Sequence, residues 1–155
     1  MTIRPIGSAD LPHLKPIIDA TEMFPSGMLD DMIAGYLTKA AGNEDIWFTA
    51  ADAEDRPVSV AYCAPEQLTE GTWNLYLIAV DPAVQSKGIG RQMMDYLEEL
   101  LRERGMRILL VETSGLPEFE RTRAFYDGCG YTRAAVIPEF YGVGEDKVVF
   151  WKKLS

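Results

Sequence analysis

Two glycines and two cations lie close together in one short segment, Gln85-Ser86-Lys87-Gly88-Ile89-Gly90-Arg91. The first turn of a helix leaves backbone N–H groups unpaired and carries a partial positive charge. Glycines let a phosphate approach such N–H groups, because no Cβ lies in its way. Lys87 and Arg91 add formal positive charge beside them. The segment therefore predicts a binding site for a pyrophosphate.

The residues on either side predict a strand before this segment and a helix after it. The apolar run over residues 75–80 has the length of a strand and stops at Asp81-Pro82, a strong turn signal. After the glycines, apolar residues recur at helical spacing: Met93, Met94, Leu97, Leu100 and Leu101. A strand thus leads into a loop, and the loop leads into the N-terminus of a helix.

The whole chain predicts the order β-α-α-β-β-β-α-β-α-β-β. We expect strands over residues 3–6, 46–50, 58–64, 75–80, 106–113, 131–137 and 147–154, and a Gly-containing connection over 138–146. Helices are expected after Ser8, over 28–41, after Gly90 and over 118–128. Only residues 75–113 form a β-α-β unit, whose crossover should be right-handed with parallel strands. We therefore expect an α/β fold with a mixed, mostly antiparallel sheet and helices on both faces.

Length and composition indicate a single domain over residues 1–155. An apolar content of 47% with 25% charged residues is ordinary for a soluble globular protein. The net charge of −9 argues against nucleic acid, which requires a basic footprint, and mildly favours cationic partners. No apolar run is long enough to cross a membrane, and residues 1–5 lack the apolar core of a signal peptide. We expect a cytoplasmic protein with no membrane partner.

The residues that commonly bind metals are few and scattered. His13 is the only histidine, and no nucleophile or carboxylate pattern surrounds it. The two cysteines, Cys63 and Cys129, have no metal-site spacing and are too few for a disulfide framework. We expect ordinary thiols, a surface histidine and no metal.

Three families of phosphate-binding proteins place glycines at a turn between a strand and a helix. A Walker A loop ends in Gly-Lys-Ser/Thr, whereas the order here is Ser86-Lys87-Gly88. A dinucleotide fold requires Gly-x-Gly-x-x-Gly directly after the strand, and Met93 stands where the third glycine belongs. Glu112 imitates the ribose-binding acid of that fold, but a single β-α-β unit is not a doubly wound sheet.

The third family fits these residues. The order Gln85-x-x-Gly88-x-Gly90, after a strand that ends in Ile78-Ala79-Val80, resembles the acyl-CoA-binding signature of the GNAT superfamily, the Gcn5-related N-acetyltransferases. Ala124-Phe125-Tyr126 with Gly130-Tyr131 is similar to the family's Ala-x-x-Phe-Tyr-x-x-x-Gly-Phe segment in contracted spacing. The resemblance covers residues 73–154, and the order of strands and helices also matches. It implies a GNAT-like acyl-CoA N-acyltransferase fold.

The resemblance also implies an activity and a set of binding residues. An acetyl group would move from acetyl-CoA to a primary amine of a small molecule, peptide or protein by direct attack. The backbone of Ile78, Ala79 and Val80 would pair with the pantetheine arm like an added strand. The pyrophosphate would bind the backbone N–H groups of Gln85, Ser86, Lys87, Gly88, Ile89, Gly90 and Arg91. Tyr126 would protonate the departing thiolate.

The resemblance does not identify the residue that acts as general base. Gcn5-like members carry a glutamate where this chain has Asn74, and the family's usual asparagine before the tyrosine is Phe119 here. An amine like that of lysine costs roughly 4–5 kcal/mol to deprotonate at pH 7, so a base would help. Glu112, at the end of a strand, is the first candidate, and Glu139, in the aromatic connection, is the second.

Two further expectations concern the oxyanion and the partners. The amide of Val80 could donate to the thioester oxygen, as in an oxyanion hole. The replaced Asn and Glu also leave open a rival class of protein, an acyl-CoA sensor of the same fold without turnover. Acidic composition and Phe140-Tyr141 favour a cationic acceptor, and the C-terminal edge strands would allow a homodimer.

Overall fold

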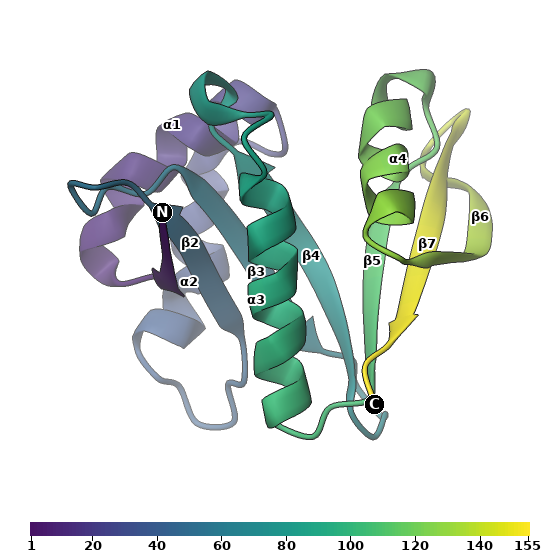
Figure 1. Ribbon diagram of the computed structural model, residues 1–155, viewed down its shortest axis with the longest axis horizontal. Coiled ribbons are helices and arrows are strands. Elements are labelled where there is room, and N and C mark those ends of the chain that lie inside the picture. Colours follow the sequence, from purple (N-terminus) through teal and green to yellow (C-terminus); the bar gives the residue numbers. More distant parts are fainter. The chain divides into compact units, whose positions relative to one another are not determined.

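The structure is a computed structural model that describes residues 1–155, in two compact units. The first unit contains Met1–Ala64 and Tyr76–Leu97, and the second contains Pro65–Leu75 and Glu98–Ser155. The strands are β1 (Thr2–Pro5), β2 (Ile46–Ala51), β3 (Ser59–Pro65), β4 (Thr72–Val80), β5 (Ile108–Ser114), β6 (Thr132–Gly142) and β7 (Glu145–Lys153). The helices are α1 (Leu11–Thr21), α2 (Leu29–Leu37), α3 (Ile89–Glu103) and α4 (Glu120–Gly128), shown in Figure 1.

The strand pairing confirms the predicted sheet. Hydrogen bonds link the strands in the order β1-β2-β3-β4-β5-β7-β6. The pairs β1–β2, β2–β3, β5–β7 and β6–β7 are antiparallel, whereas β4 and β5 are parallel and α3 connects them along the chain. The fold is therefore the mixed, mostly antiparallel sheet with one parallel β-α-β unit that the sequence predicts. The single domain over residues 1–155 stays a prediction.

In the first unit, helices cover both faces of the strands (Figure 1). The apolar sides of α1 and α2 pack on one face, in a cluster made by Ile6, Leu14, Ile17, Ile18, Leu29, Ile33, Trp47, Val60, Leu77 and Ala79. Successive side chains of a strand point to opposite faces, so Phe48 lies on the face opposite Trp47. There Phe48 packs against Tyr96 of α3, with ring centroids 5.2 Å apart.

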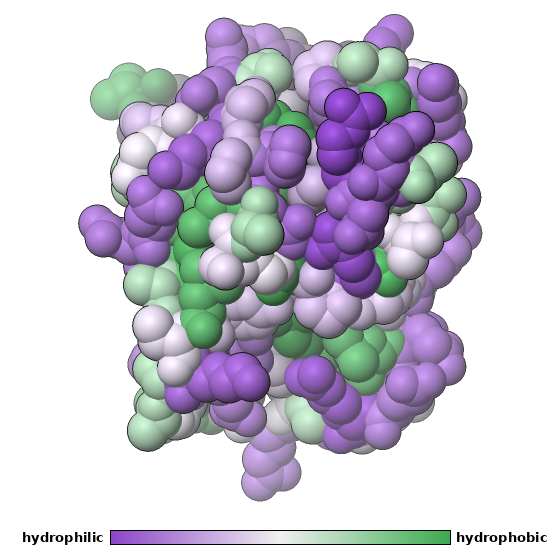
Figure 2. Space-filling view, turned by 90° about the vertical axis from the view of Figure 1, so that its left-hand side faces the viewer, coloured by the Kyte–Doolittle hydropathy of each residue, from purple (hydrophilic) through white to green (hydrophobic).

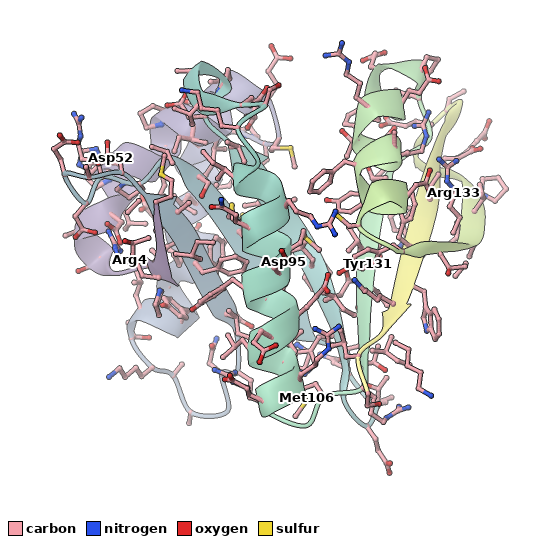
Figure 3. All side chains as sticks on the ribbon, in the orientation of Figure 1. Arg4, Asp52, Asp95, Met106, Tyr131 and Arg133 are labelled. Atoms are coloured by element: carbon pink, nitrogen blue, oxygen red, sulfur yellow. The ribbon has the colours of Figure 1, made fainter.

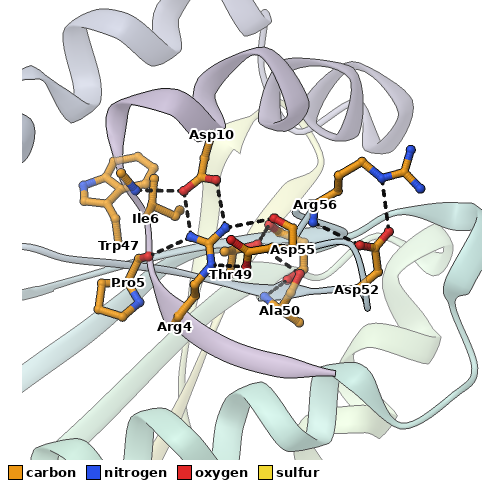
Figure 4. Close-up of polar contacts among 12 residues, drawn as sticks. Arg4, Pro5, Ile6, Asp10, Trp47, Thr49, Ala50, Asp52, Asp55 and Arg56 are labelled. Atoms are coloured by element: carbon orange, nitrogen blue, oxygen red, sulfur yellow. Dashed lines mark hydrogen bonds and ion pairs between the residues drawn. The ribbon is translucent and has the colours of Figure 1, made fainter.

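A charged network fixes the start of the chain (Figure 4). The Arg4 guanidinium donates to both carboxylate oxygens of Asp10, at 2.8 and 2.9 Å, and to Oδ1 of Asp55 at 2.9 Å. The backbone N–H of Gly7 also donates to Asp10, at 2.8 Å. The hydrogen bond from Arg4 is the main cause that lowers the pKa of Asp10 below its usual value.

We expect Asp10→Asn to lower the free energy of unfolding by about 1–2 kcal/mol at pH 7. Because the folded pKa lies below the unfolded one, this stability is present above the usual carboxyl range and is lost as the pH falls through the folded pKa. Urea denaturation should therefore show a difference from the wild type that shrinks below about pH 4. Glu44→Gln, at an exposed residue, is the control. A difference that acid does not reduce would contradict this account of Arg4 and Asp10.

In the second unit, a buried carboxylate links α3 to the strands. Glu98 of α3 is 4% exposed and accepts hydrogen bonds from the Tyr131 hydroxyl and from Nζ of Lys152, both at 2.8 Å. Lys152 also donates to the carbonyl oxygen of Cys129 at 2.9 Å. Tyr131, labelled in Figure 3, directly precedes β6, so this network ties the end of α4, the start of β6 and β7 to α3 within the unit.

The predicted connection over residues 138–146 is wrong. Strand β6 continues to Gly142 and β7 begins at Glu145, which leaves only Val143 and Gly144 between them. Gly144 has a φ of 75°, a value that tight turns require and glycine adopts at little cost. Strand β6 is the last in the sheet order and is exposed along its whole length, so it tolerates Pro138 and an irregular register near it.

The surface is largely hydrophilic where Figure 2 shows it, with hydrophobic side chains in smaller areas between. None of the helices combines the length and the apolar character needed to cross a membrane. His13 is exposed, as predicted.

Candidate active site

The loop after β4 is tied back to the end of that strand. The Asp81 carboxylate accepts the backbone N–H of Ala83 at 3.0 Å and so caps the short turn Pro82–Val84. The side-chain amide of Gln85 donates to the carbonyl oxygen of Val80 at 3.0 Å. Gln85, the first residue of the predicted phosphate segment, therefore fixes the loop that precedes α3.

The start of α3 presents backbone N–H groups with no partner inside the protein. Ser86 and Gly88 have φ values of 66° and 79°, and α3 begins at Ile89. The first helical hydrogen bond runs from the N–H of Gln92 to the carbonyl of Gly88 at 3.1 Å. The N–H groups of residues 87–90 donate to no other group of the protein. They are four of the seven N–H groups, those of residues 85–91, that the sequence predicts to hold a pyrophosphate.

The surroundings of these N–H groups are open. A Cβ added at Gly88 would meet no atom within 4 Å, so its positive φ rather than crowding requires glycine there. Lys87 is exposed, and Arg91 is exposed with its guanidinium 3.7 Å from Asp95. The segment thus combines unpaired donors, positive charge and room for an anion.

Along the end of β4, side chains alternate between the core and the other face. Ala79 is 5% exposed and belongs to the core cluster, whereas Ile78 and Val80 are half-buried. The side chain of Ala79 is therefore out of reach of a ligand that pairs with this strand, and Ala79 can contribute only its backbone.

Tyr126 lies on α4 and is 3% exposed. Its ring packs on Phe150 of β7 and on Tyr131, with centroids 5.4 and 6.1 Å apart. Its hydroxyl makes no hydrogen bond within the protein. Burial raises the pKa of Tyr126 well above its usual value, so the phenol keeps its proton at neutral pH and has it available to donate. Phe119, where the family usually has asparagine, is half-buried just before α4.

Glu112 lies on β5 and forms both of its contacts through one oxygen. Its Oε2 is 2.9 Å from Nζ of Lys147 and accepts a hydrogen bond from Nδ2 of Asn74 at 3.2 Å. Glu112 is opposite Val149 in the β5–β7 register, whereas the next residue, Phe150, packs against α4. Glu112 and Tyr126 therefore lie on opposite faces of this part of the sheet, and no contact joins them.

Glu139 is exposed on β6, and its contacts stay within the β6–β7 hairpin. Its backbone N–H donates to Oδ1 of Asp146 at 2.9 Å, and its own Oε1 accepts the N–H of Gly144 at 3.4 Å. No hydrogen bond or ion pair joins it to Glu112 or Tyr126. The hydrogen-bond and ion-pair partners of Glu112 and those of Glu139 thus have no residue in common.

One carboxylate near Glu112 was not predicted as a site residue. Nδ2 of Asn74 donates to Oε1 of Glu66 at 2.8 Å, in addition to Glu112. Glu66 begins the turn between β3 and β4, and its N–H donates to the carbonyl of Thr72 at 2.8 Å. In the sequence, Glu66 is one of several polar residues in a loop. Only the expected closure of the hairpin between the two strands could have indicated that Glu66 lies near Asn74.

No group of three or more histidine, cysteine, aspartate or glutamate side chains is arranged to hold a metal ion. Cys63 and Cys129 are buried and form no disulfide.

Comparisons with known proteins agree with the predicted fold. The model of the acetyltransferase (GNAT) family matches residues 14–131. A mycothiol acetyltransferase from Beutenbergia cavernae is 36% identical over 72 residues, which are 46% of this chain but only 23% of that protein. A GNAT-family structure from Desulfovibrio desulfuricans has a TM-score of 0.91 at 28% identity, over 99% of each chain. An aminoglycoside 6'-N-acetyltransferase complexed with coenzyme A has a TM-score of 0.78 at 19% identity, over 100% of this chain and 98% of that one.

The match to the family model extends from α1 to the residue before β6 and includes the unpaired N–H groups at the start of α3 and Tyr126. The resemblance seen in the sequence is thereby confirmed: the chain belongs to the acetyltransferase (GNAT) family.

Proposed function

We propose that this protein is an acetyl-CoA-dependent N-acetyltransferase that acetylates a primary amine of a small molecule, peptide or protein. The observation that carries the proposal is the run of unpaired N–H groups over residues 87–90, in a chain of the GNAT family. Helix N-termini with such groups bind phosphates, and coenzyme A carries a pyrophosphate.

The end of β4 and the start of α3 would hold the cofactor. The N–H groups of residues 87–90 would donate to the pyrophosphate, and Lys87 and Arg91 would add charge beside it. The backbone of residues 78–80 would pair with the pantetheine arm, in the manner of an added strand. A related fold complexed with coenzyme A supports this choice of ligand.

Two side chains are proposed to move the protons. The amine nitrogen attacks the thioester carbonyl carbon, the N–C bond forms, and the C–S bond then breaks. Tyr126 would give its proton to the departing thiolate from one face of the sheet, and Glu112 would take a proton from the amine on the other face. The amide of Val80 would donate to the oxygen that becomes negative. Glu139 stays the second candidate for the base.

The acceptor is proposed to carry positive charge. The protein has a net charge of −9, and Phe140 and Tyr141 are exposed on β6. Aromatic faces attract cations, and Phe140 already holds Nζ of Lys147 3.9 Å from its ring centroid. A small cationic amine, or a lysine or N-terminal amine of a peptide, fits these features. We also propose a cytoplasmic location and a homodimer through the exposed edge of β6.

Incubating the purified protein with acetyl-CoA and a panel of primary amines tests the proposal. We expect steady release of coenzyme A with at least one amine, and mass spectrometry should find that amine heavier by one acetyl group.

The second candidate function is an acyl-CoA sensor, because Asn74 replaces the family's glutamate and Glu112 is paired with Lys147. Binding of acetyl-CoA without release for any amine would favour the sensor and contradict the transferase.

A further inference from the structure

Two carboxylates of the second unit share one hydrogen-bond donor. Nδ2 of Asn74 donates to Glu66 at 2.8 Å and to Glu112 at 3.2 Å. Both distances start at the same nitrogen, so the two acceptor oxygens are within about 6 Å of each other. Two carboxylates at that separation repel each other when both are charged. The amide therefore holds together two groups whose charges oppose the arrangement.

Asn74 occupies this position at a cost to stability. The residue is 2% exposed, and its Oδ1 is one of two buried side-chain polar atoms without a hydrogen-bond partner. An unpaired buried polar atom of this kind destabilises the folded state, and native structures contain few of them. An apolar side chain at this point of β4 would avoid that cost but would remove the donor shared by Glu66 and Glu112. A functional role for the amide accounts for its presence.

Charges on three neighbouring elements act on Glu112. Nζ of Lys147 of β7 is 2.9 Å from the Glu112 carboxylate, and Glu66 shares the Asn74 amide with it. Tyr141 of β6 senses the same charges, because burial first, and then the charges of Glu112 and Glu145, raise its pKa above the usual value. Glu112 therefore stands between one cation and a second acid.

We propose that Asn74 and Glu66 are positioning residues for Glu112, a role that rests on the proposed transferase function. Asn74 and Lys147 both contact Oε2, so they orient the carboxylate with Oε1 as the oxygen that takes the proton. The negative charge of Glu66 offsets Lys147, so that Glu112 accepts a proton from the amine while the N–C bond forms. The proton then resides on Glu112, and the thiolate leaves with a proton from Tyr126.

The dependence of kcat/KM on pH tests this inference. Glu66→Gln removes a negative charge, so we expect the acidic limb to move down by about one pH unit and the plateau to fall about tenfold. Asn74→Asp adds a negative charge and removes the donor, so its limb should move up instead. A purely structural role would not produce shifts of opposite sign. Glu66→Asp keeps the charge and should restore the position of the wild-type limb.

The matched control is Glu70→Gln, which removes the same charge from an exposed residue of the same turn and should leave the profile unchanged. Calorimetry should give the same affinity for acetyl-CoA in all variants, which also shows that they fold. Wild-type turnover with unmoved limbs in Glu66→Gln and Asn74→Asp overturns this inference alone. Absence of wild-type turnover with every amine overturns the transferase proposal and this inference with it.

Discussion

Gly90→Glu should raise the Kd for acetyl-CoA about 100-fold, or about 2.8 kcal/mol. Gly90 lies in the first turn of α3, beside the unpaired N–H groups of residues 87–89. A carboxylate there would stand against the two phosphates that those groups are proposed to bind, and like charges at contact distance repel by several kcal/mol. Isothermal titration calorimetry of the purified variant measures the change.

A loss of affinity in Gly90→Glu should not result from unfolding of α3. A glutamate in the first turn of a helix interacts favourably with the helix dipole, so α3 should not be destabilised. Gly90→Ala is the matched control, because alanine favours the helix and adds no charge, and its Kd should stay within a few-fold of the wild type. Wild-type affinity in Gly90→Glu would show that the start of α3 does not hold the phosphates.

Tyr126→Phe should lower kcat by roughly 10²–10³-fold and leave the affinity for acetyl-CoA nearly unchanged. The phenol is the proposed proton donor to the thiolate, and phenylalanine keeps the ring that packs on Phe150 and Tyr131. The hydroxyl makes no hydrogen bond in the protein, so urea denaturation should give the same stability for both proteins. Full activity in Tyr126→Phe would exclude the tyrosine as the acid.

The pH profile offers a second test of Tyr126. Burial raises its pKa above the usual value of about 10, so the proton-bearing form persists across the neutral and mildly alkaline range. Loss of that proton should therefore lower kcat only above about pH 10. A fall in kcat at lower pH that Tyr126→Phe abolishes would contradict this assignment.

Features that depend on neighbouring residues could be predicted from the sequence. The strand ending at Val80, the turn at Asp81-Pro82 and the glycines before α3 form one continuous segment, and each part has its own local signal. The mixed sheet followed from the order of such segments. The unpaired N–H groups could be expected for the same reason, because every helix start leaves them unless a neighbour pairs with them.

Features that depend on residues far apart in the chain could not be predicted from the sequence. Asn74 and Glu112 are 38 residues apart and meet through the parallel register of β4 and β5, which the sequence does not specify. Glu66 joins them only because the β3–β4 hairpin closes. The continuation of β6 past Pro138 depends on its place at the edge of the sheet, where a missing N–H has no strand partner to lose.

A titration of ¹⁵N-labelled protein with acetyl-CoA, followed by amide NMR, tests the central claim most directly. If the start of α3 holds the pyrophosphate, the amide resonances of Lys87, Gly88, Ile89 and Gly90 should shift and saturate together. The same titration of Gly90→Glu should leave the remaining three near their free positions. Saturable binding that moves other amides while these stay unchanged would contradict the proposed phosphate site.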